Sequence, residues 1–456
     1  MEGLPAGGTK DVGSGDNADD DGGGMNRNTM AFTALASASI LVSYADRGNL
    51  ASTIVPMGEQ FGWSPGFEGL VLSAFFVGYA STQMFGGWLA DRYGGRQTLI
   101  LGLAVWSVFT IITPLAAAQD TITLLATRVG LGLGEGFAFP SVHAMIAETV
   151  PKGQRSTVVG CVTAASYMGA LVAFSVSPTI MRSTGGWEAV FYAFGGASLL
   201  LLPAWVLLPL GKAKVPLGAE EKLMSGENAP GDDNTTGGAH GLSLEEQARE
   251  LGSVAMRLSK RKEVWAIVGA QFCQSVGMYG LLSWLPTYLH DVRGLAADSS
   301  ELGALAAAPY AIQALAGAWA GLTADRLIAE RGWRVKTVRQ TMQTAGMLGP
   351  AICMGAAVFE AQADISVAWI MLGSGISAVT LGGVSTNHLD ISPRNAGLVF
   401  GAGNTAATIA GLLTVPLCGW LVETYDSWDG VFLLFATSYI LGALLFLAWV
   451  GDEEIE

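Results

Sequence analysis

Four charged side chains interrupt stretches of the sequence that are otherwise apolar: Asp46, Arg47, Arg128 and Glu135. A charge inside a lipid bilayer costs about 2.5 kcal/mol or more, so such residues usually face a cavity or a partner of opposite charge. Guanidinium groups bind anions, and a buried carboxyl group can exchange a proton. These four residues are therefore the first candidates for chemistry.

The spacing of Arg128 and Glu135 predicts a shared helix face. They are seven residues apart, which places them about 10 Å from each other along the helix axis. That separation is too long for a direct pair, and it leaves Arg128 free to hold an anion and Glu135 free to titrate. Asp46 and Arg47 are neighbours and cannot face each other on one helix, and we expect Arg47 to point inward.

A structural reading of the same residues stays open. Arg128 would then lie near a helix end, with its charged group reaching the membrane surface. Asp46 and Glu135 would only neutralise Arg47 or Arg128 across helices.

The composition places these charges in a membrane. Of the 456 residues, 51% are hydrophobic and only 14% are charged, and the mean hydropathy is +0.43, whereas soluble domains carry about 25% charged residues. Twelve apolar runs reach the roughly 20 residues that a membrane span needs. They lie near 30–56, 67–90, 97–118, 121–149, 155–182, 187–210, 263–290, 300–325, 340–361, 365–388, 395–422 and 429–450.

Polar stretches divide the chain around these runs. Eighteen of the 38 acids lie in residues 1–27, 211–262 and 452–456. Alternate loops place eighteen Lys and Arg residues on one side and only Arg182 and Arg293 on the other, so the basic side is predicted to be cytoplasmic. The predicted parts are a disordered acidic cytoplasmic tail (1–28), an N-terminal six-helix bundle (29–210), a cytoplasmic linker (211–262), a C-terminal six-helix bundle (263–450) and a cytoplasmic tail (451–456).

A short motif occurs twice at corresponding positions. The pattern GxxADR spans 87–92 after the second predicted span and 321–326 after the eighth. With two further matches at nearly the same offset, it indicates two pseudo-symmetric halves. An acid and an arginine at such helix ends could lock one gate state, although ordinary helix ends with orienting arginines would look alike. The candidate gating residues are Gly87, Asp91, Arg92, Arg96, Asp325 and Arg326.

Several stretches together resemble the major facilitator superfamily, and within it the anion:cation symporter family. That family includes sodium/phosphate and organic-anion cotransporters, sialin-like carriers and plant plastid phosphate transporters. The resemblance covers about residues 30 to 450 and implies the all-α major facilitator fold of twelve transmembrane helices in two six-helix bundles. It rests on 87–96, Ala45-Asp46-Arg47-Gly48-Asn49-Leu50, Gly132-Leu133-Gly134-Glu135-Gly136, Leu282-Ser283-Trp284-Leu285-Pro286-Thr287-Tyr288 and Asn387-His388-Leu389-Asp390.

The resemblance also implies roles for individual residues. Arg47, Arg128 and Glu135 match family positions implicated in anion binding and proton coupling. His143 matches a family histidine that either relays protons or caps part of its helix, and we favour the cap. Tyr79, Gln274, Tyr279 and Asn404 lie in similar stretches and are candidates for hydrogen bonds to substrate. Gln274 and Leu72 stand where the vesicular glutamate branch carries arginine and histidine, so a dicarboxylate would lose a cationic partner.

These observations predict an alternating-access symporter for inorganic phosphate or a small organic anion, coupled to a proton or sodium gradient. A carrier of sugar acids or other monocarboxylates is the nearest alternative, and a membrane sensor or scaffold that moves no solute is another. The sequence has no P-loop, HExxH or GxSxG motif and no metal-binding cysteine spacing, so we expect neither an enzyme nor a metal site nor a cofactor beyond the coupling ion. The expected partners are the anion and the lipid bilayer, with no nucleic acid, and we expect a monomer.

Overall fold

The computed structural model describes residues 25, 27–151, 154–208, 252–392, 396–451 and 455. Most of the predicted tail 1–28, most of the predicted linker 211–262 and most of the predicted tail 451–456 lie outside the described residues.

The described residues form helices and their connections. The first half contains α1 (Arg27–Phe61), α2 (Pro65–Tyr93), α3 (Gly95–Gln119), α4 (Thr121–Glu135), α5 (Ala138–Thr149), α6 (Arg155–Thr184) and α7 (Glu188–Leu207). The second half contains α10 (Lys262–Arg293), α11 (Ser300–Ala329), α12 (Val335–Phe359), α13 (Ala363–Ser377), the 3-10 helix η2 (Ala378–Gly382), α14 (Val384–Ile391), α15 (Ala396–Tyr425) and α16 (Asp429–Trp449).

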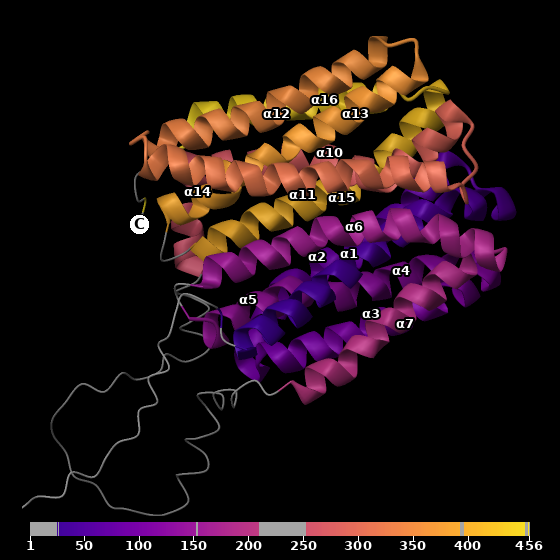
Figure 1. Cartoon of the computed structure of the whole chain (residues 1–456), viewed down its shortest axis with the longest axis horizontal. Coiled ribbons are helices and arrows are strands. Elements are labelled where there is room, and N and C mark those ends of the chain that lie inside the picture. The colour runs from indigo at the N-terminus through magenta and orange to yellow at the C-terminus, as the bar shows by residue number, and fades with distance from the viewer. Residues whose placement is uncertain are drawn as a thin grey trace, which may run out of the picture.

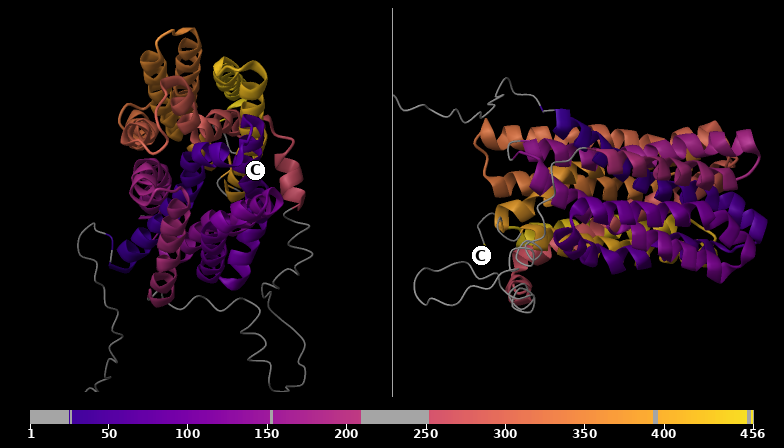
Figure 2. Two further views of the ribbon diagram at one scale, coloured as in Figure 1. Left: turned by 90° about the vertical axis from the view of Figure 1, so that its right-hand side faces the viewer. Right: turned by 90° about the horizontal axis from the view of Figure 1, so that it is seen from below.

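The helices run side by side as two bundles (Figure 1). Seen along the helix axes, the first half forms one lobe and the second half the other (Figure 2, left). The lobes meet where α2 packs on α15, α6 on α11 and α1 on α10. We call the end at which α7 finishes and α10 starts the linker end, and the other the far end.

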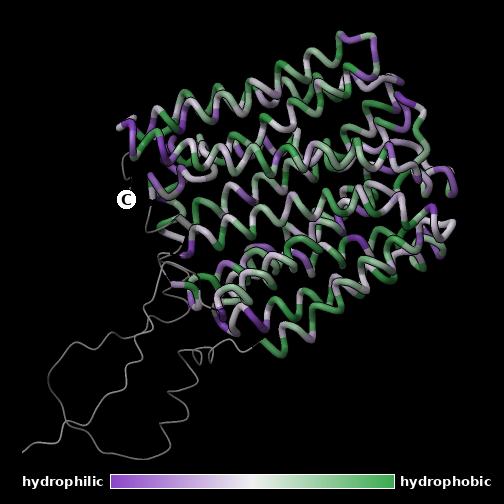
Figure 3. Tube along the Cα trace, in the orientation of Figure 1, coloured by the Kyte–Doolittle hydropathy of each residue, from purple (hydrophilic) through white to green (hydrophobic). Residues whose placement is uncertain are grey.

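Length and composition support membrane crossing. Among the described residues, nine helical segments are long and apolar enough to span a membrane, counting α4 with α5 and α13 with α14 as one segment each. Helices α1, α2 and α10 are not among the nine, but their 35, 29 and 32 residues exceed the roughly 20 that a span needs. With them the number of spans is twelve. Hydrophilic residues gather at the two ends of the bundles (Figure 3).

Glycines bring α4 close to its neighbours and so place Arg128 and Glu135. A Cβ atom on Gly134 would lie 2.6 Å from the backbone nitrogen of Trp106 on α3, and one on Gly132 would overlap the carbonyl oxygen of Phe75 on α2. Only glycine permits this contact without moving the backbone. The glycine-rich stretch of α4 is therefore a packing surface.

Candidate substrate and coupling site

An ion pair joins α1 to α4 in the middle of the first bundle. The Nε of Arg47 donates to the Oε2 of Glu135 at 2.9 Å, and the Ser43 hydroxyl donates to the same oxygen at 2.8 Å. The Arg47 side chain is 5% exposed and that of Glu135 is 0% exposed. Arg47 thus points inward as expected, but Glu135, which the helix spacing left free, is engaged by a neighbouring helix.

Aromatic rings enclose the rest of the Arg47 guanidinium group. Its Cζ lies 4.4 Å from the ring centre of Tyr44, 4.7 Å from that of Phe75 and 4.6 Å from that of Tyr79. Such contacts stabilise a cation by about 0.5–2 kcal/mol each. Both Nη1 and Nη2 are buried without a well-formed hydrogen bond to any described residue. The guanidinium group therefore has two donors without a well-formed partner among the described residues, and Tyr279 of the second bundle lies close to the same group.

Arg128 and Asp46 complete the buried charges. Arg128 is 1% exposed, so it does not reach the membrane surface, and its Nε and Nη1 have no hydrogen-bond partner among the described residues. The Asp46 carboxylate accepts from the Asn49 amide at 3.1 Å and from the Ser198 hydroxyl at 3.5 Å. It also lies within electrostatic range of Arg128 and Glu135. Two acids and two arginines thus lie close together in the first bundle.

The second bundle meets this group through aromatic side chains. The Tyr279 ring on α10 lies 4.8 Å from the Phe76 ring on α2, and Tyr279 is within electrostatic range of Arg47 and Tyr79. Tyr79 and Tyr279 therefore lie together with Arg47. Gln274 does not join them through a described hydrogen bond, because its amide donates to the Thr380 hydroxyl at 2.6 Å inside the second bundle. Asn404 lies half-buried on α15.

The two bundles touch at both ends. At the far end, the Glu423 carboxylate accepts from the Gly66 amide at 2.9 Å and from the Ser64 hydroxyl at 3.0 Å. At the linker end, the His143 ring lies 6.1 Å from the Phe400 ring. Two cavities of about 10 Å³ each lie in the second bundle, and neither is lined by Arg47 or Arg128. The residues of the charged group are themselves buried, each being at most 7% exposed.

Comparison with known proteins decides the family. The model of the Major Facilitator Superfamily matches residues 36–415. The chain belongs to this superfamily. It is a multi-pass membrane transporter rather than an enzyme, and the predicted fold of twelve helices in two bundles is confirmed.

Curated relatives of this major facilitator are named as anion carriers. "Probable anion transporter 1, chloroplastic" of Oryza sativa subsp. japonica is 33% identical over 99% of this chain and 82% of its own length. "Sodium-dependent phosphate transport protein 1, chloroplastic" of Arabidopsis thaliana is 33% identical over 92% of this chain and 79% of its own. "Ascorbate transporter, chloroplastic" of Arabidopsis thaliana is 32% identical over 92% and 74%. These names agree with the predicted anion:cation symporter family.

Solved structures share the fold. A D-xylose–proton symporter has a TM-score of 0.72 at 18% identity, covering 93% of this chain and 98% of its own. A bacterial homologue of the human lysosomal transporter Spinster, solved in an inward-facing and unoccupied conformation, has a TM-score of 0.67 at 18% identity, covering 94% and 96%.

His143 of this major facilitator lies on α5 between two rings. The Phe139 ring is 6.1 Å away, and so is Phe400, which in turn lies 5.4 Å from the His388 ring. No described hydrogen bond joins His143 to Glu135. The position therefore places His143 in the contact that closes the linker end.

The six candidate gating residues are not brought together by contacts of the described side chains. Arg96 donates to the Trp205 and Val206 carbonyl oxygens at 2.8 and 2.6 Å, so it caps the end of α7 within the first bundle. The Arg92 guanidinium group lies 5.9 Å from the Trp88 ring. Gly87 is not in close contact, since a Cβ atom placed on it would lie 4.0 Å from Pro140. Asp325 and Arg326 are exposed, and the Asp91 side chain lies outside the described part.

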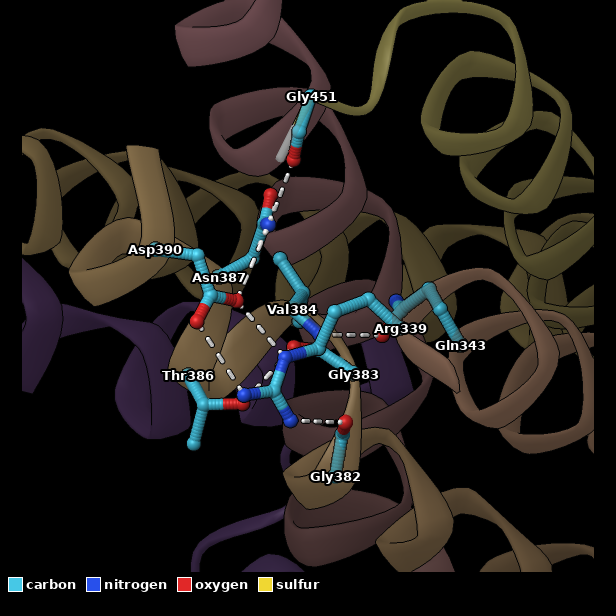
Figure 4. A network of polar contacts seen from close by, with 9 residues as sticks. All are labelled: Arg339, Gln343, Gly382, Gly383, Val384, Thr386, Asn387, Asp390 and Gly451. Carbon is cyan, nitrogen blue, oxygen red and sulfur yellow. Dashed lines mark hydrogen bonds and ion pairs between the residues drawn. The ribbon is translucent and has the colours of Figure 1, made fainter. Parts of the chain in front are cut away.

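The sequence analysis missed a buried ion pair at the linker end of the second bundle (Figure 4). Arg339 on α12 donates through Nε to Asp390 on α14 at 2.8 Å and through Nη1 to the Gly382 carbonyl oxygen at 3.0 Å. The Asn387 amide adds a bond to the Gly451 carbonyl oxygen at 3.0 Å. In the sequence, Arg339 is one of the eighteen basic residues on the predicted cytoplasmic side. Two features of the sequence could have indicated this pair: Arg339 lies at the edge of a predicted span, and Asp390 lies in the polar stretch 387–390 at the end of another.

Proposed function

We propose that this transporter carries a small anion by alternating access, with Arg47 and Arg128 as anion ligands. The observation that carries the proposal is the Arg47 guanidinium group, whose two buried Nη atoms make no well-formed hydrogen bond to a described residue and which Tyr279 of the second bundle approaches. An unpaired buried donor costs about 1–3 kcal/mol. An anion that accepts from both atoms removes this cost in the occupied state.

Glu135 links the anion to a coupling ion in this proposal. The Arg47–Glu135 pair is nearly neutral as a unit, so an incoming anion adds a negative charge next to a buried carboxylate. A negative charge beside a carboxylate favours the protonated form of that carboxyl group, here Glu135. Anion and proton therefore bind together, which is the requirement for symport. Sodium is the alternative coupling ion, and the name of one relative, a sodium-dependent phosphate transport protein, is consistent with it.

The relatives support two substrate classes. One relative is named for phosphate and another for ascorbate, at nearly equal identity to this chain. Inorganic phosphate and a small organic anion are therefore both candidate substrates, and sugar acids or other monocarboxylates are the alternative. Gln274 and Leu72 lack the cationic character of the glutamate carriers, which disfavours dicarboxylates. Tyr79, Tyr279, Gln274 and Asn404 remain the proposed hydrogen-bonding residues.

The remaining proposals concern the moving parts and the membrane. We place the linker end and both termini in the cytoplasm because basic residues crowd the loops of that end. His143 and the GxxADR residues would then act at the cytoplasmic gate, and Ser64, Gly66 and Glu423 close the opposite side. The chloroplastic relatives make an organelle membrane the first to test with a fluorescent tag.

Uptake into reconstituted vesicles tests the proposal. Phosphate, ascorbate and gluconate are offered under imposed pH and sodium gradients, to wild type and to Arg47→Ala. We expect wild type to accumulate at least one anion and Arg47→Ala to lose that uptake. Arg293→Ala is the matched control, because Arg293 only pairs with Asp364 at 3.0 Å and Glu301 at 3.4 Å near the far end. Uptake that survives in Arg47→Ala removes Arg47 from the site.

A further inference from the structure

One face of α2 is turned toward the second bundle. Phe76, Tyr79 and Gln83 follow each other by three and four residues, so they share this face. Phe76 meets the Tyr279 ring on α10, and the Oε1 of Gln83 accepts from the Thr408 hydroxyl on α15 at 3.4 Å. Tyr79, between them, covers the Arg47 guanidinium group. Gln83 is thus the next polar side chain on this face after the proposed anion site.

The Gln83 amide is only half-satisfied. The residue is 9% exposed, and its Nε2 has no hydrogen-bond partner among the described residues. The single proton of the Thr408 hydroxyl can go instead to the Asn404 carbonyl oxygen, 2.9 Å away, and the amide can then rotate so that Nε2 faces the Thr408 oxygen. The hydroxyl would then accept from Nε2, and Oε1 would be left open. In either orientation one atom of this buried amide lacks a partner among the described residues, as does the Oε1 of Gln313, and such atoms are uncommon in folded proteins.

The distance from Tyr79 selects the kind of molecule that this amide can meet. Four residues on a helix correspond to about 6 Å along the axis. Tyr79 covers the Arg47 guanidinium group, so we infer that a ligand must extend by about one helical turn to contact both Arg47 and Gln83, which a compact phosphate ion does not. An extended anion reaches the Gln83 amide, and a hydroxyl group satisfies either open amide atom because it both donates and accepts.

We infer that Gln83 determines specificity, by hydrogen-bonding a hydroxyl group of an extended, hydroxylated organic anion whose acidic group binds Arg47. The inference rests on the proposed function and names its substrate class as sugar-acid-like rather than phosphate. Thr408 is a positioning residue, because its hydroxyl bonds one end of the Gln83 amide and competes with the substrate for that amide.

Kinetic constants for gluconate and phosphate in reconstituted vesicles test this role. Gln83→Leu removes the amide and leaves an apolar side chain that is one atom shorter, so the KM for gluconate should rise about 2- to 10-fold, as expected for one hydrogen bond, while the KM for phosphate stays unchanged. Thr408→Val removes the competing hydroxyl and should lower the KM for gluconate. Gln313→Leu is the control, because this buried amide binds Ser374 and Ser377 inside the second bundle and should leave the ratio of the two KM values unchanged. The ratio does not depend on how much protein folds.

Two results would overturn the inference while leaving the proposed function intact. One is a wild type that carries phosphate and no gluconate. The other is a Gln83→Leu variant in which both KM values change by the same factor, since that outcome makes Gln83 a packing residue. In contrast, an Arg47→Ala variant that still carries both anions contradicts the proposed function itself.

Discussion

The two bundles share one arrangement of helices but differ in where they bury charge. In the first, Asp46, Arg47, Arg128 and Glu135 are each at most 7% exposed in the middle of the helices. In the second, the buried ion pair among the described residues joins Arg339 to Asp390 near the linker end, with side chains 9% and 19% exposed. Similar backbones therefore support two different uses of charge.

In the proposed function, the buried charges of the first bundle are arranged to bind a ligand, and those of the second to stabilise the fold. The central charges of the first bundle leave donors of two arginines without a well-formed hydrogen bond to the described part of the chain, which is unfavourable for stability and favourable for a ligand. The pair of the second bundle is well bonded: Arg339 reaches Asp390 and a backbone carbonyl oxygen, and it ties α12 to the broken helix formed by α13, η2 and α14. We conclude that the first bundle carries the ionic chemistry and the second supplies rings, amides and a rigid frame.

Removing the central acid should have the largest effect on transport. In Glu135→Gln, Arg47 keeps its aromatic cage but loses its charge partner, so the anion binds while no proton can follow. We expect gradient-driven accumulation to fall by about tenfold or more, equivalent to at least ~1.4 kcal/mol of lost coupling, whereas exchange of internal for external anion persists. Both rates are measured in vesicles.

Glu301→Gln is the matched control, because this exposed acid pairs with Arg293 at 3.4 Å outside the central group. Equal loss of exchange and accumulation in Glu135→Gln would mean that the acid only holds Arg47 in place.

Breaking the pair of the second bundle should affect stability more than transport. Arg339→Met leaves the Asp390 carboxylate without its partner, which costs roughly 3 kcal/mol, the lower end for buried pairs because Asp390 is partly exposed. The Tm of the purified protein should fall by several degrees, while the KM of the folded fraction is unchanged. The double variant Arg339→Met/Asp390→Leu should recover much of the loss, since it removes both charges. A double variant as unstable as the single one would show that the carbonyl contacts matter more than the ion pair.

The contrast between the bundles was only partly predictable from the sequence. Hydrophobic length predicted the spans, and the repeated motif predicted two halves. The charged positions were found because Asp46, Arg47, Arg128 and Glu135 stand alone in apolar runs. Periodicity gives the face of a helix but not the neighbour that it meets, so the pairing of Arg47 with Glu135, 88 residues apart, could not be derived.

Other residues gave weaker signals for a related reason. Gln83 resembles any amide on a packed helix, and only its contact with α15 singles it out. Arg339 stands at the edge of a span, where arginines usually mark orientation. Its burial became visible only once α14 was placed beside α12.

The smallest expected effect concerns how the corresponding spans of the two bundles begin at the far end. Helix α4 is capped by Asp120, which accepts from the Thr123 amide at 2.9 Å and from its hydroxyl at 2.6 Å, whereas Gln362 before α13 makes no capping hydrogen bond with its side chain. The bonds from the Thr123 hydroxyl and then its backbone amide lower the pKa of the Asp120 carboxyl group.

Because the pKa of Asp120 is lowered in the folded protein, the cap stabilises the protein above the ordinary pKa of about 3.9. This contribution disappears as the pH falls through the lower pKa of the folded state. The Tm of Asp120→Ala should therefore lie slightly below that of wild type near pH ~6 and approach it toward pH ~3, while Gln362→Ala shows no such dependence. A Tm difference that stays constant with pH would mean that packing at the start of α4, and not the charge of Asp120, distinguishes the two spans.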